Sequence, residues 1–243
     1  MYSTNSADKT QAFFSNRALK HKRIPKHLFA KVWALIKQHT TPHDTLSVLD
    51  AGCGAGAWSR RFKEKKCEVT GLDFSEGMLK LAKSLDHRLG YCRSDLFHFP
   101  VCDNAFDVVF FGYVLHHFTK PEIGKILREA HRVVKKNGVV ASIDPNLVNP
   151  YNFLKIHPLS PLRDNVNHIP HEKPLTSKDF EDCCSIFYRT YFHTFSFIPS
   201  LKVDASGNLA RTFFVTLDDK LEALPLTSIF GSNIVMIGKK HDF

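Results

Sequence analysis

The sequence predicts an α/β fold in which helices cover both faces of a mostly parallel sheet, so that the domain has three layers. Beyond residue 46, short runs rich in β-branched and apolar residues alternate with segments of helical periodicity, as this fold class requires. The run Phe106–Phe111 (FDVVFF) has the apolar character of a strand that is covered on both faces. The composition, with 43% hydrophobic and 23% charged residues among 243, is that of a soluble globular protein.

Seven runs are predicted to be strands: Leu46–Asp50, Cys67–Leu72, Leu89–Arg93, Phe106–Phe111, Val139–Ile143, Tyr188–Phe195 and Asn233–Gly238. Helices are predicted between them. Ser75 can cap a helix that runs to Leu85. The spacing Thr119-x-x-Glu122 is a capping box for a helix that continues through Val134 and ends at Asn137-Gly138. A similar spacing, Thr176-x-x-Asp179, predicts the start of a further helix.

Several classes of protein are excluded by absent features. No window of 18 uninterrupted apolar residues is present, so no transmembrane segment is expected. Residues 1–14 have neither the basic nor the apolar region of a signal peptide. Six irregularly spaced cysteines without a signal peptide are typical of reduced thiols, which predicts a cytoplasmic protein. No pair of CxxC or CxxH motifs occurs, and we expect no metal site.

The positive charge is concentrated near the N-terminus. The net charge is +9, and no acidic residue lies between Asp8 and Asp44. The cations of that region are Lys9, Arg17, Lys20, Lys22, Arg23, Lys26, Lys31 and Lys37. Apolar residues recur there at intervals of three and four, which predicts an amphipathic helix. We expect residues 1–40 to form a basic helical arm that packs on the domain as a lid. The alternatives are contact with an anionic membrane surface or with nucleic acid.

The domain itself is predicted to span residues 41–243, with insertions at about 145–175 and 198–232. The first insertion contains six prolines, and the second is aromatic and apolar. Long insertions in compact domains are commonly lids or binding loops. Because both fall near the end of the predicted sheet, we expect them to determine substrate specificity.

The most informative segment is Leu49–Gly56 (LDAGCGAG), which directly follows a strand and opens a helix. Open α/β folds bind ligands at this edge of the sheet, and glycines let a ligand lie on the main chain. Gly52, Gly54 and Ala57 also satisfy the G-x-G-x-x-A pattern of a dinucleotide site, which would indicate a nicotinamide dehydrogenase. However, Asp50 precedes the first glycine, and an acid there suits a ligand with an ammonium group better than a pyrophosphate.

Further motifs follow at Asn104–Val109, Leu115–Phe118, Leu127–Ala130 and Lys136–Val139. Together with the glycine loop they resemble the class I S-adenosylmethionine-dependent methyltransferases, in particular the small-molecule branch that includes the ubiquinone and menaquinone biosynthesis enzymes. The resemblance covers about Val48–Asp144 and is loose near Leu221–Pro225 and the final strand. It implies a Rossmann-like sandwich with seven strands, the last one antiparallel. It also implies S-adenosylmethionine as cofactor, S-adenosylhomocysteine as product and no metal.

The resemblance places the cofactor along the ends of the predicted strands. The positions that it implies are Asp50, Gly52, Cys53, Gly54, Gly56, Asp73, Phe74, Met78, Ser94, Asp95, Leu96, Phe111 and Gly112. Asp50 would lie near the amino group of the methionine part, and Asp73 would accept hydrogen bonds from both ribose hydroxyls. Phe74 or Met78 would pack on the adenine, whose edge would meet Asp95.

Methyl transfer from a sulfonium requires alignment of the acceptor and exclusion of water. A base is needed only if the acceptor keeps its proton at neutral pH. His116 and His117, which follow the fourth predicted strand, are the candidates for that base, and Tyr113 could orient an acceptor. All three could instead be packing or capping residues.

The acceptor is expected to be a small, apolar or lipid-like molecule, because the insertions are aromatic and apolar. One alternative is an RNA methyltransferase whose basic arm contacts phosphates. Another is a module that binds the cofactor without catalysis. Methylation of amino groups on nucleic-acid bases is not expected, since Phe110–Tyr113 lacks the Asn/Asp-Pro-Pro-aromatic motif of those enzymes.

Overall fold

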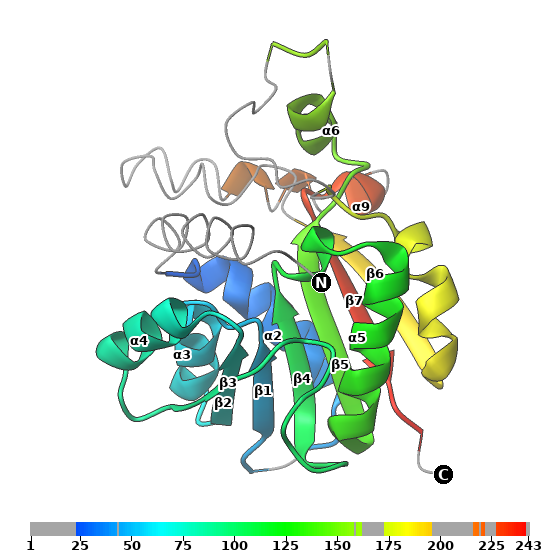
Figure 1. Cartoon of the computed structure of the whole chain (residues 1–243). Helices are drawn as coiled ribbons and strands as arrows, with labels where there is room; N and C mark the ends of the chain where they lie inside the picture. Colours follow the sequence, from blue (N-terminus) through cyan, green and yellow to red (C-terminus); the bar gives the residue numbers. More distant parts are fainter. Residues whose placement is uncertain are drawn as a thin grey trace, which may run out of the picture.

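The computed structural model describes residues 23–42, 44–157, 159–161, 173–195, 216–218, 220–221 and 227–241. Its centre is a seven-stranded sheet of order β3-β2-β1-β4-β5-β7-β6 (Figure 1). The strands are β1 (Ser47–Ala51), β2 (Glu68–Asp73), β3 (Gly90–Arg93), β4 (Phe106–Gly112), β5 (Val134–Pro145), β6 (Arg189–Phe195) and β7 (Asn233–Lys239). Strands β1 to β5 pair in parallel, and β7 pairs antiparallel with both β5 and β6. The predicted fold class is therefore confirmed.

Helices and 3-10 helices flank the sheet. They are α2 (Lys26–His39), α3 (Ala57–Glu64), α4 (Glu76–Leu85), η1 (Leu115–His117), α5 (Lys120–Val133), α6 (Pro150–Ile156), η2 (Ser177–Asp179), η3 (Glu181–Ile186) and α9 (Thr227–Phe230). Side chains of successive strand residues point to opposite faces. In β1, Val48 accordingly joins the core under α2 and α3, while the next residue, Leu49, joins the core under α5. Both faces of the sheet are therefore covered.

The apolar stripe of α2 is buried in the core on one face of the sheet. Leu28, Phe29, Val32 and Ile36 are each at most 3% exposed, and α2 contacts β5 and β7. The described part of the predicted arm is thus one of the helices that cover the sheet. Residues 1–22 of that arm lie outside the described residues.

The prediction that the helix after Thr119 continues through Val134 to Asn137-Gly138 is wrong. Helix α5 ends at Val133, and Val134 begins β5, where it pairs with Phe106 of β4. Asn137 has a φ of +62°, and a Cβ on Gly138 would lie 2.7 Å from the carbonyl oxygen of Asp107. The two residues form an irregularity inside the strand, because pairing with β4 outweighs the local breaker signal.

The segment after Thr176 differs from the prediction in helix type. The capping box with Asp179 is present, but it opens two short 3-10 helices, η2 and η3, in place of an α-helix. In the first predicted insertion, α6 projects from the end of the sheet (Figure 1). Residues 158, 162–172, 198–215, 219 and 222–226 of the two insertions lie outside the described residues.

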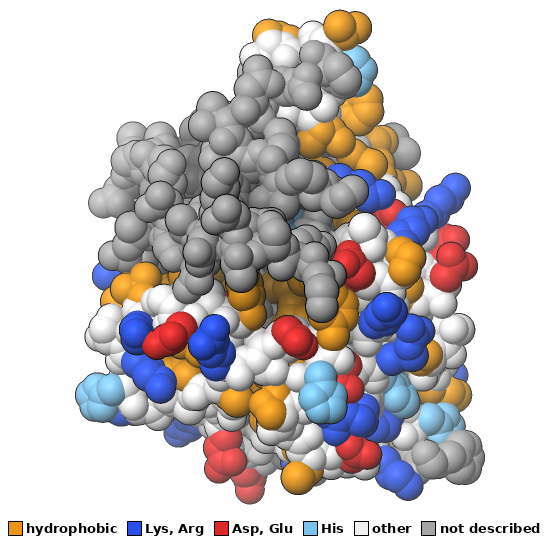
Figure 2. All heavy atoms as spheres, in the orientation of Figure 1, with side chains coloured by type: hydrophobic (Ala, Val, Ile, Leu, Met, Phe, Trp, Pro, Cys, Tyr) orange, Lys and Arg blue, Asp and Glu red, His pale blue; other side chains and the backbone are white. Residues whose placement is uncertain are grey.

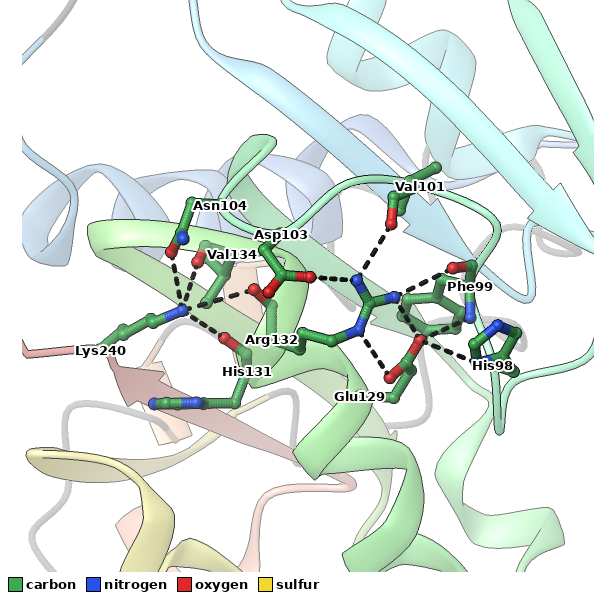
Figure 3. Close-up of polar contacts among 10 residues, drawn as sticks. All are labelled: His98, Phe99, Val101, Asp103, Asn104, Glu129, His131, Arg132, Val134 and Lys240. Carbon is green, nitrogen blue, oxygen red and sulfur yellow. Dashed lines mark hydrogen bonds and ion pairs between the residues drawn. The ribbon is translucent and has the colours of Figure 1, made fainter.

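A charged network anchors the connection between β3 and β4 to helix α5 (Figure 3). The guanidinium of Arg132 donates hydrogen bonds to the carboxylates of Glu129 and Asp103 and to the carbonyl oxygens of Phe99 and Val101. These contacts hold the long connection against the domain.

Two properties concern the described residues as a group. None of the helices found there is both long enough and apolar enough to cross a membrane. The same part of the chain contains no group of three or more His, Cys, Asp or Glu side chains placed to hold a metal ion.

Candidate functional site

Several of the predicted cofactor positions lie at one edge of the sheet, where the parallel strands end. The register aligns these ends, since Ala51 pairs with Leu72 and Gly112 with Ile143. Helices α6 and α9 lie at the same end of the molecule (Figure 1). Ligands of open α/β folds bind at this edge.

The glycine loop folds back on β2 and leaves part of its backbone uncovered. Gly52, Gly54 and Gly56 have φ values of +76°, +52° and +71°, a region that favours glycine. The backbone N–H groups of Gly52 and Cys53 donate to the carbonyl oxygen of Leu72 at 2.7 and 2.9 Å. No atom of the described residues would lie within 4 Å of a Cβ on Gly54. As far as the described residues show, the main chain at Gly54 is therefore open to a ligand.

The carboxylate of Asp73 fastens this loop. Its Oδ2 accepts the backbone N–H of Gly54 at 2.8 Å, and its Oδ1 accepts that of Ser75 at 2.8 Å. The side chain is only 7% exposed, and burial raises the pKa of Asp73 while the two N–H donors oppose that rise. A carboxylate oxygen can accept more than one hydrogen bond, so Asp73 retains the capacity to bind ligand hydroxyls.

Asp50 is a buried carboxylate with one oxygen engaged. Its Oδ2 accepts a hydrogen bond of 2.5 Å from Ser59 Oγ, whereas Oδ1 has no hydrogen-bond partner among the described residues. Burial raises the pKa of Asp50 to about 7, and the Ser59 hydrogen bonds oppose this rise. A buried carboxylate oxygen without a partner is suited to a cationic ligand. The sequence analysis did not identify Ser59, which faces Asp50 only because α3 packs beside β1.

The two candidate adenine-packing residues differ in exposure. The ring of Phe74 is 46% exposed, whereas Met78 is buried and its backbone N–H donates to the capping Ser75 Oγ at 3.4 Å. Phe74 directly follows Asp73, the last residue of β2. Phe74 is the more accessible of the two surfaces for a planar group.

The residues after β3 are only partly brought to this edge. The backbone N–H of Ser94 donates to the carbonyl oxygen of Asp73 at 3.1 Å, which joins the ends of β2 and β3. Asp95 is exposed, and its Oδ1 accepts two backbone N–H groups of its own turn at 2.8 and 3.0 Å. Leu96 is buried in the core. Asp95 therefore shapes its turn through one oxygen.

The end of β4 is tightly packed. Phe111 is fully buried in the core, so its side chain is not presented to a ligand. A Cβ on Gly112 would collide with the indole nitrogen of Trp58. Tyr113 has a φ of +60°, and its hydroxyl donates to Oδ1 of Asn233 at 2.7 Å. The sequence did not predict these contacts of Trp58 and Asn233, because the two residues belong to α3 and β7, which are distant in sequence from the end of β4.

His116 contacts a carboxylate that the sequence analysis missed. Its Nδ1 lies 2.9 Å from Oδ1 of Asp144, and its backbone N–H donates to the same oxygen at 3.2 Å. Asp144 is fully buried near the end of β5, and burial raises its pKa. The ring of His117 packs on that of His116 at 4.0 Å between centroids. The sequence could have predicted Asp144, because it is an acid near the end of a strand, as Asp73 is.

Comparison with known proteins identifies this part of the chain. Residues 49–142 match the family described as a methyltransferase domain. They form an S-adenosylmethionine-dependent methyltransferase domain.

Two relatives illustrate how far the likeness of this methyltransferase domain extends. A malonyl-[acyl-carrier protein] O-methyltransferase of Buchnera aphidicola is 38% identical over 95 residues, which are 39% of this chain and 38% of that protein. A demethylmenaquinone methyltransferase of Listeria welshimeri is 38% identical over 111 residues, or 42% of this chain and 46% of that protein. The matched segment therefore spans less than half the length of these relatives. The resemblance to quinone-biosynthesis methyltransferases is confirmed at the level of this domain.

A solved structure extends the likeness of fold beyond the domain. A methyltransferase from Archaeoglobus fulgidus aligns with 88% of this chain and 94% of its own, with a TM-score of 0.60 and 19% identity. This similarity concerns the fold, and it covers more of the chain than the matched domain does.

Proposed function

We propose that this chain transfers a methyl group from S-adenosylmethionine to a small, apolar or lipid-like acceptor. The observation that carries the proposal is that two features occur in the same loop region. Asp50 is a buried carboxylate whose Oδ1 has no hydrogen-bond partner among the described residues, and the backbone at Gly54 is not covered by them. Asp50 would hold the amino group of the cofactor, Gly54 would lie under its methionine part, and Asp73 would bind the ribose hydroxyls. The cofactor, when bound, supplies a methyl group activated by a positively charged sulfur.

The acceptor side of the proposal rests on apolar surface at the same end of the sheet. Phe153 and Leu154 of α6 are 48% and 40% exposed, and Ile229 of α9 is 56% exposed. Figure 2 shows apolar side chains at the surface around this end of the molecule. The relatives are named for malonyl-[acyl-carrier protein] and demethylmenaquinone as acceptors, and the apolar entrance suits an apolar acceptor.

Calorimetry with S-adenosylmethionine, S-adenosylhomocysteine and NAD tests the donor side. We expect both sulfur ligands to bind and NAD not to bind, because Asp50 offers a negative charge where a pyrophosphate would lie. Preferential binding of NAD would contradict the proposal. An Asp50→Asn variant that binds the sulfur ligands unchanged would contradict the role of Asp50.

A charge-neutralised variant tests the alternatives of RNA and membrane binding. Lys9, Arg17, Lys20 and Lys22 are replaced together by Gln in the full chain, and the α2 cations are left in place. We expect RNA gel shifts and co-sedimentation with anionic vesicles to change little. Strong, salt-sensitive binding that the variant loses would favour a docking role for the N-terminal residues.

The cysteines favour a reducing compartment. All six lie in described parts of the chain, and none is paired in a disulfide. This supports the cytoplasm as the site of action.

A further inference from the structure

We propose that the end of the molecule around α6 docks on an anionic lipid bilayer. The surface concerned, which we call the α6 surface, consists of exposed apolar side chains from two segments: Val148, Phe153, Leu154, Leu159, Ile229 and Phe230. Helix α6 projects from the end of the sheet (Figure 1), and Figure 2 shows apolar side chains over the same end. Docking there goes beyond the proposed function, because it requires neither the cofactor nor methyl transfer.

Helix α6 is attached to the domain by polar contacts. None of the residues of this seven-residue helix is buried. Three asparagine side chains donate hydrogen bonds of 2.7–3.0 Å to carbonyl oxygens of residues 229–232, at the junction of α9 and β7. These donors lie at intervals of three residues: Asn146, Asn149 and Asn152. The hydrogen bonds fix the position of α6, so burial of its apolar side chains is not what holds it.

The apolar side chains on and after α6 are exposed in fixed positions. Phe153 and Leu154 are 48% and 40% exposed, and Leu159 is 88% exposed. The turn that carries Leu159 is closed by His157. Its Nδ1 accepts the backbone N–H of Leu159 at 3.4 Å, and its carbonyl oxygen accepts that of Ser160 at 3.1 Å. Apolar side chains that gather at an exposed site commonly mark a binding surface, so the α6 surface is suited to an apolar partner.

The charge around the α6 surface complements anionic lipid. The chain has 24 acidic residues, yet none lies in residues 145–163 or 223–233, the two segments that supply the surface. Lys155 is the one charged residue of α6, and its Nζ lies 5.4 Å from the centre of the Tyr151 ring. Lysine and tyrosine combine an apolar part with a polar end, as residues at the boundary of headgroups and acyl chains do. Negative headgroups also attract a cation near the membrane surface.

The shape of the α6 surface favours a bilayer over a protein partner. A helix of seven residues is only about 10 Å long, whereas a stable protein interface buries about 800 Å² on each partner. A bilayer needs no matching shape, and apolar side chains of a peripheral helix enter it to a depth of about 5–10 Å. Docking would also bring the strand ends near α6 to the membrane, where a lipid-like acceptor would be dissolved.

Co-sedimentation of the full chain with phosphatidylcholine vesicles that contain about 30% phosphatidylserine tests the proposal without cofactor. We expect the wild type to bind, and Phe153→Ser and Leu154→Ser each to lower the partition coefficient about tenfold, because an apolar side chain is lost from the lipid. Leu85→Ser is the matched control and should bind like the wild type, since Leu85 at the end of α4 is 41% exposed and Leu154 is 40% exposed. Lys155→Gln should weaken binding to these vesicles and have little effect with phosphatidylcholine alone.

A Phe153→Trp variant measures direct contact with the acyl chains. Vesicles of brominated phosphatidylcholine with the same share of phosphatidylserine should quench its fluorescence more than that of the wild type, whose Trp58 is buried. Equal quenching overturns the proposal.

Three other results also overturn it. The wild type does not co-sediment, or Phe153→Ser and Leu154→Ser bind as strongly as the wild type. The third is a wild-type dimer in analytical ultracentrifugation that Leu154→Ser dissociates, which would assign the α6 surface to a second copy of the chain. Calorimetry with S-adenosylmethionine tests the proposed function separately, because vesicle binding needs no cofactor.

Discussion

The backbone N–H of Gly54 donates a 2.8 Å hydrogen bond to Oδ2 of Asp73, so the acid after β2 holds the loop after β1. The same side chain is the one expected to bind ribose hydroxyls. Its two tasks are compatible, because each carboxylate oxygen has more than one lone pair. Removing it should therefore affect both the loop and the ligand.

The Asp73→Ala variant is expected to lose about 2–4 kcal/mol of cofactor binding, roughly 30- to 1,000-fold in affinity, because two charge-assisted hydrogen bonds disappear. It should also lower the free energy of unfolding, since the N–H groups of Gly54 and Ser75 lose their acceptor. Calorimetry and urea denaturation measure the two effects. The exposed Asp44→Asn serves as a control. A folded Asp73→Ala protein with unchanged affinity would show that Asp73 is only structural.

Binding of S-adenosylmethionine should release a proton below about pH 7. Burial holds the pKa of Asp50 at about 7 in the free protein, and a bound ammonium group would favour its ionised form. Affinity should therefore rise as pH rises from 5 to 7. Calorimetry in buffers of different ionisation enthalpy measures the proton release. Asp50→Asn should abolish it, and equal proton release by that variant would contradict the assignment.

The same pKa has a consequence for the free protein. The folded state holds the Asp50 proton more tightly than the unfolded chain, whose carboxyl has an ordinary pKa of 3.8. The contribution of Asp50 to stability therefore declines as pH rises from about 4 to about 7. Urea denaturation should show Asp50→Asn gaining stability relative to the wild type across this window. A constant difference between the two would contradict the sign.

The Gly112→Ala substitution should destabilise the fold by about 1–3 kcal/mol through overpacking. The new methyl group would collide with the indole of Trp58 and lie 2.9 Å from the ring of Phe110. Gly90→Ala is the matched control within the sheet, because the nearest atom to its Cβ would be Thr70 Oγ1 at 3.8 Å. Urea denaturation of both variants makes the comparison. Equal stabilities would mean that the end of β4 can relax around the indole.

Acid should weaken the packing of α2 on β6. The His39 ring stacks on Tyr191 at 4.1 Å and lies 6.2 Å from His193. Burial lowers the pKa of both histidines, and His193 and Lys239 lower that of His39 further. The unfolded chain thus takes up protons first, and stability falls as pH drops below about 6.5.

A His39→Phe variant isolates this contribution, because it keeps the stacked ring without a titrating group. Thermal unfolding between pH 7 and 5 should show the wild type losing stability relative to the variant. Parallel pH profiles for the two proteins would rule out a role for His39.

The sequence by itself determined the order and type of most elements and the position of the glycine loop. These features depend on residues close together in the chain, such as the capping box at Thr119 and the breaker glycines after Asp50. The acids at strand ends could be predicted for the same reason, since parallel strands bring their carboxyl ends to one edge. Asp144 also lies near the end of a parallel strand, but it was not among the predicted site residues.

Only the tertiary structure decided which side chains meet across that edge. Tyr113 and Asn233 are 120 residues apart, and His116 and Asp144 are 28 apart, so no local pattern encodes either contact. The extension of β5 back to Val134 was likewise decided by its pairing with β4. The spacing of apolar residues within one segment indicates which of its faces is buried, but not which segment packs against that face. Partners and exact strand ends depend on hydrogen bonds between segments, which exist only once the sheet is assembled.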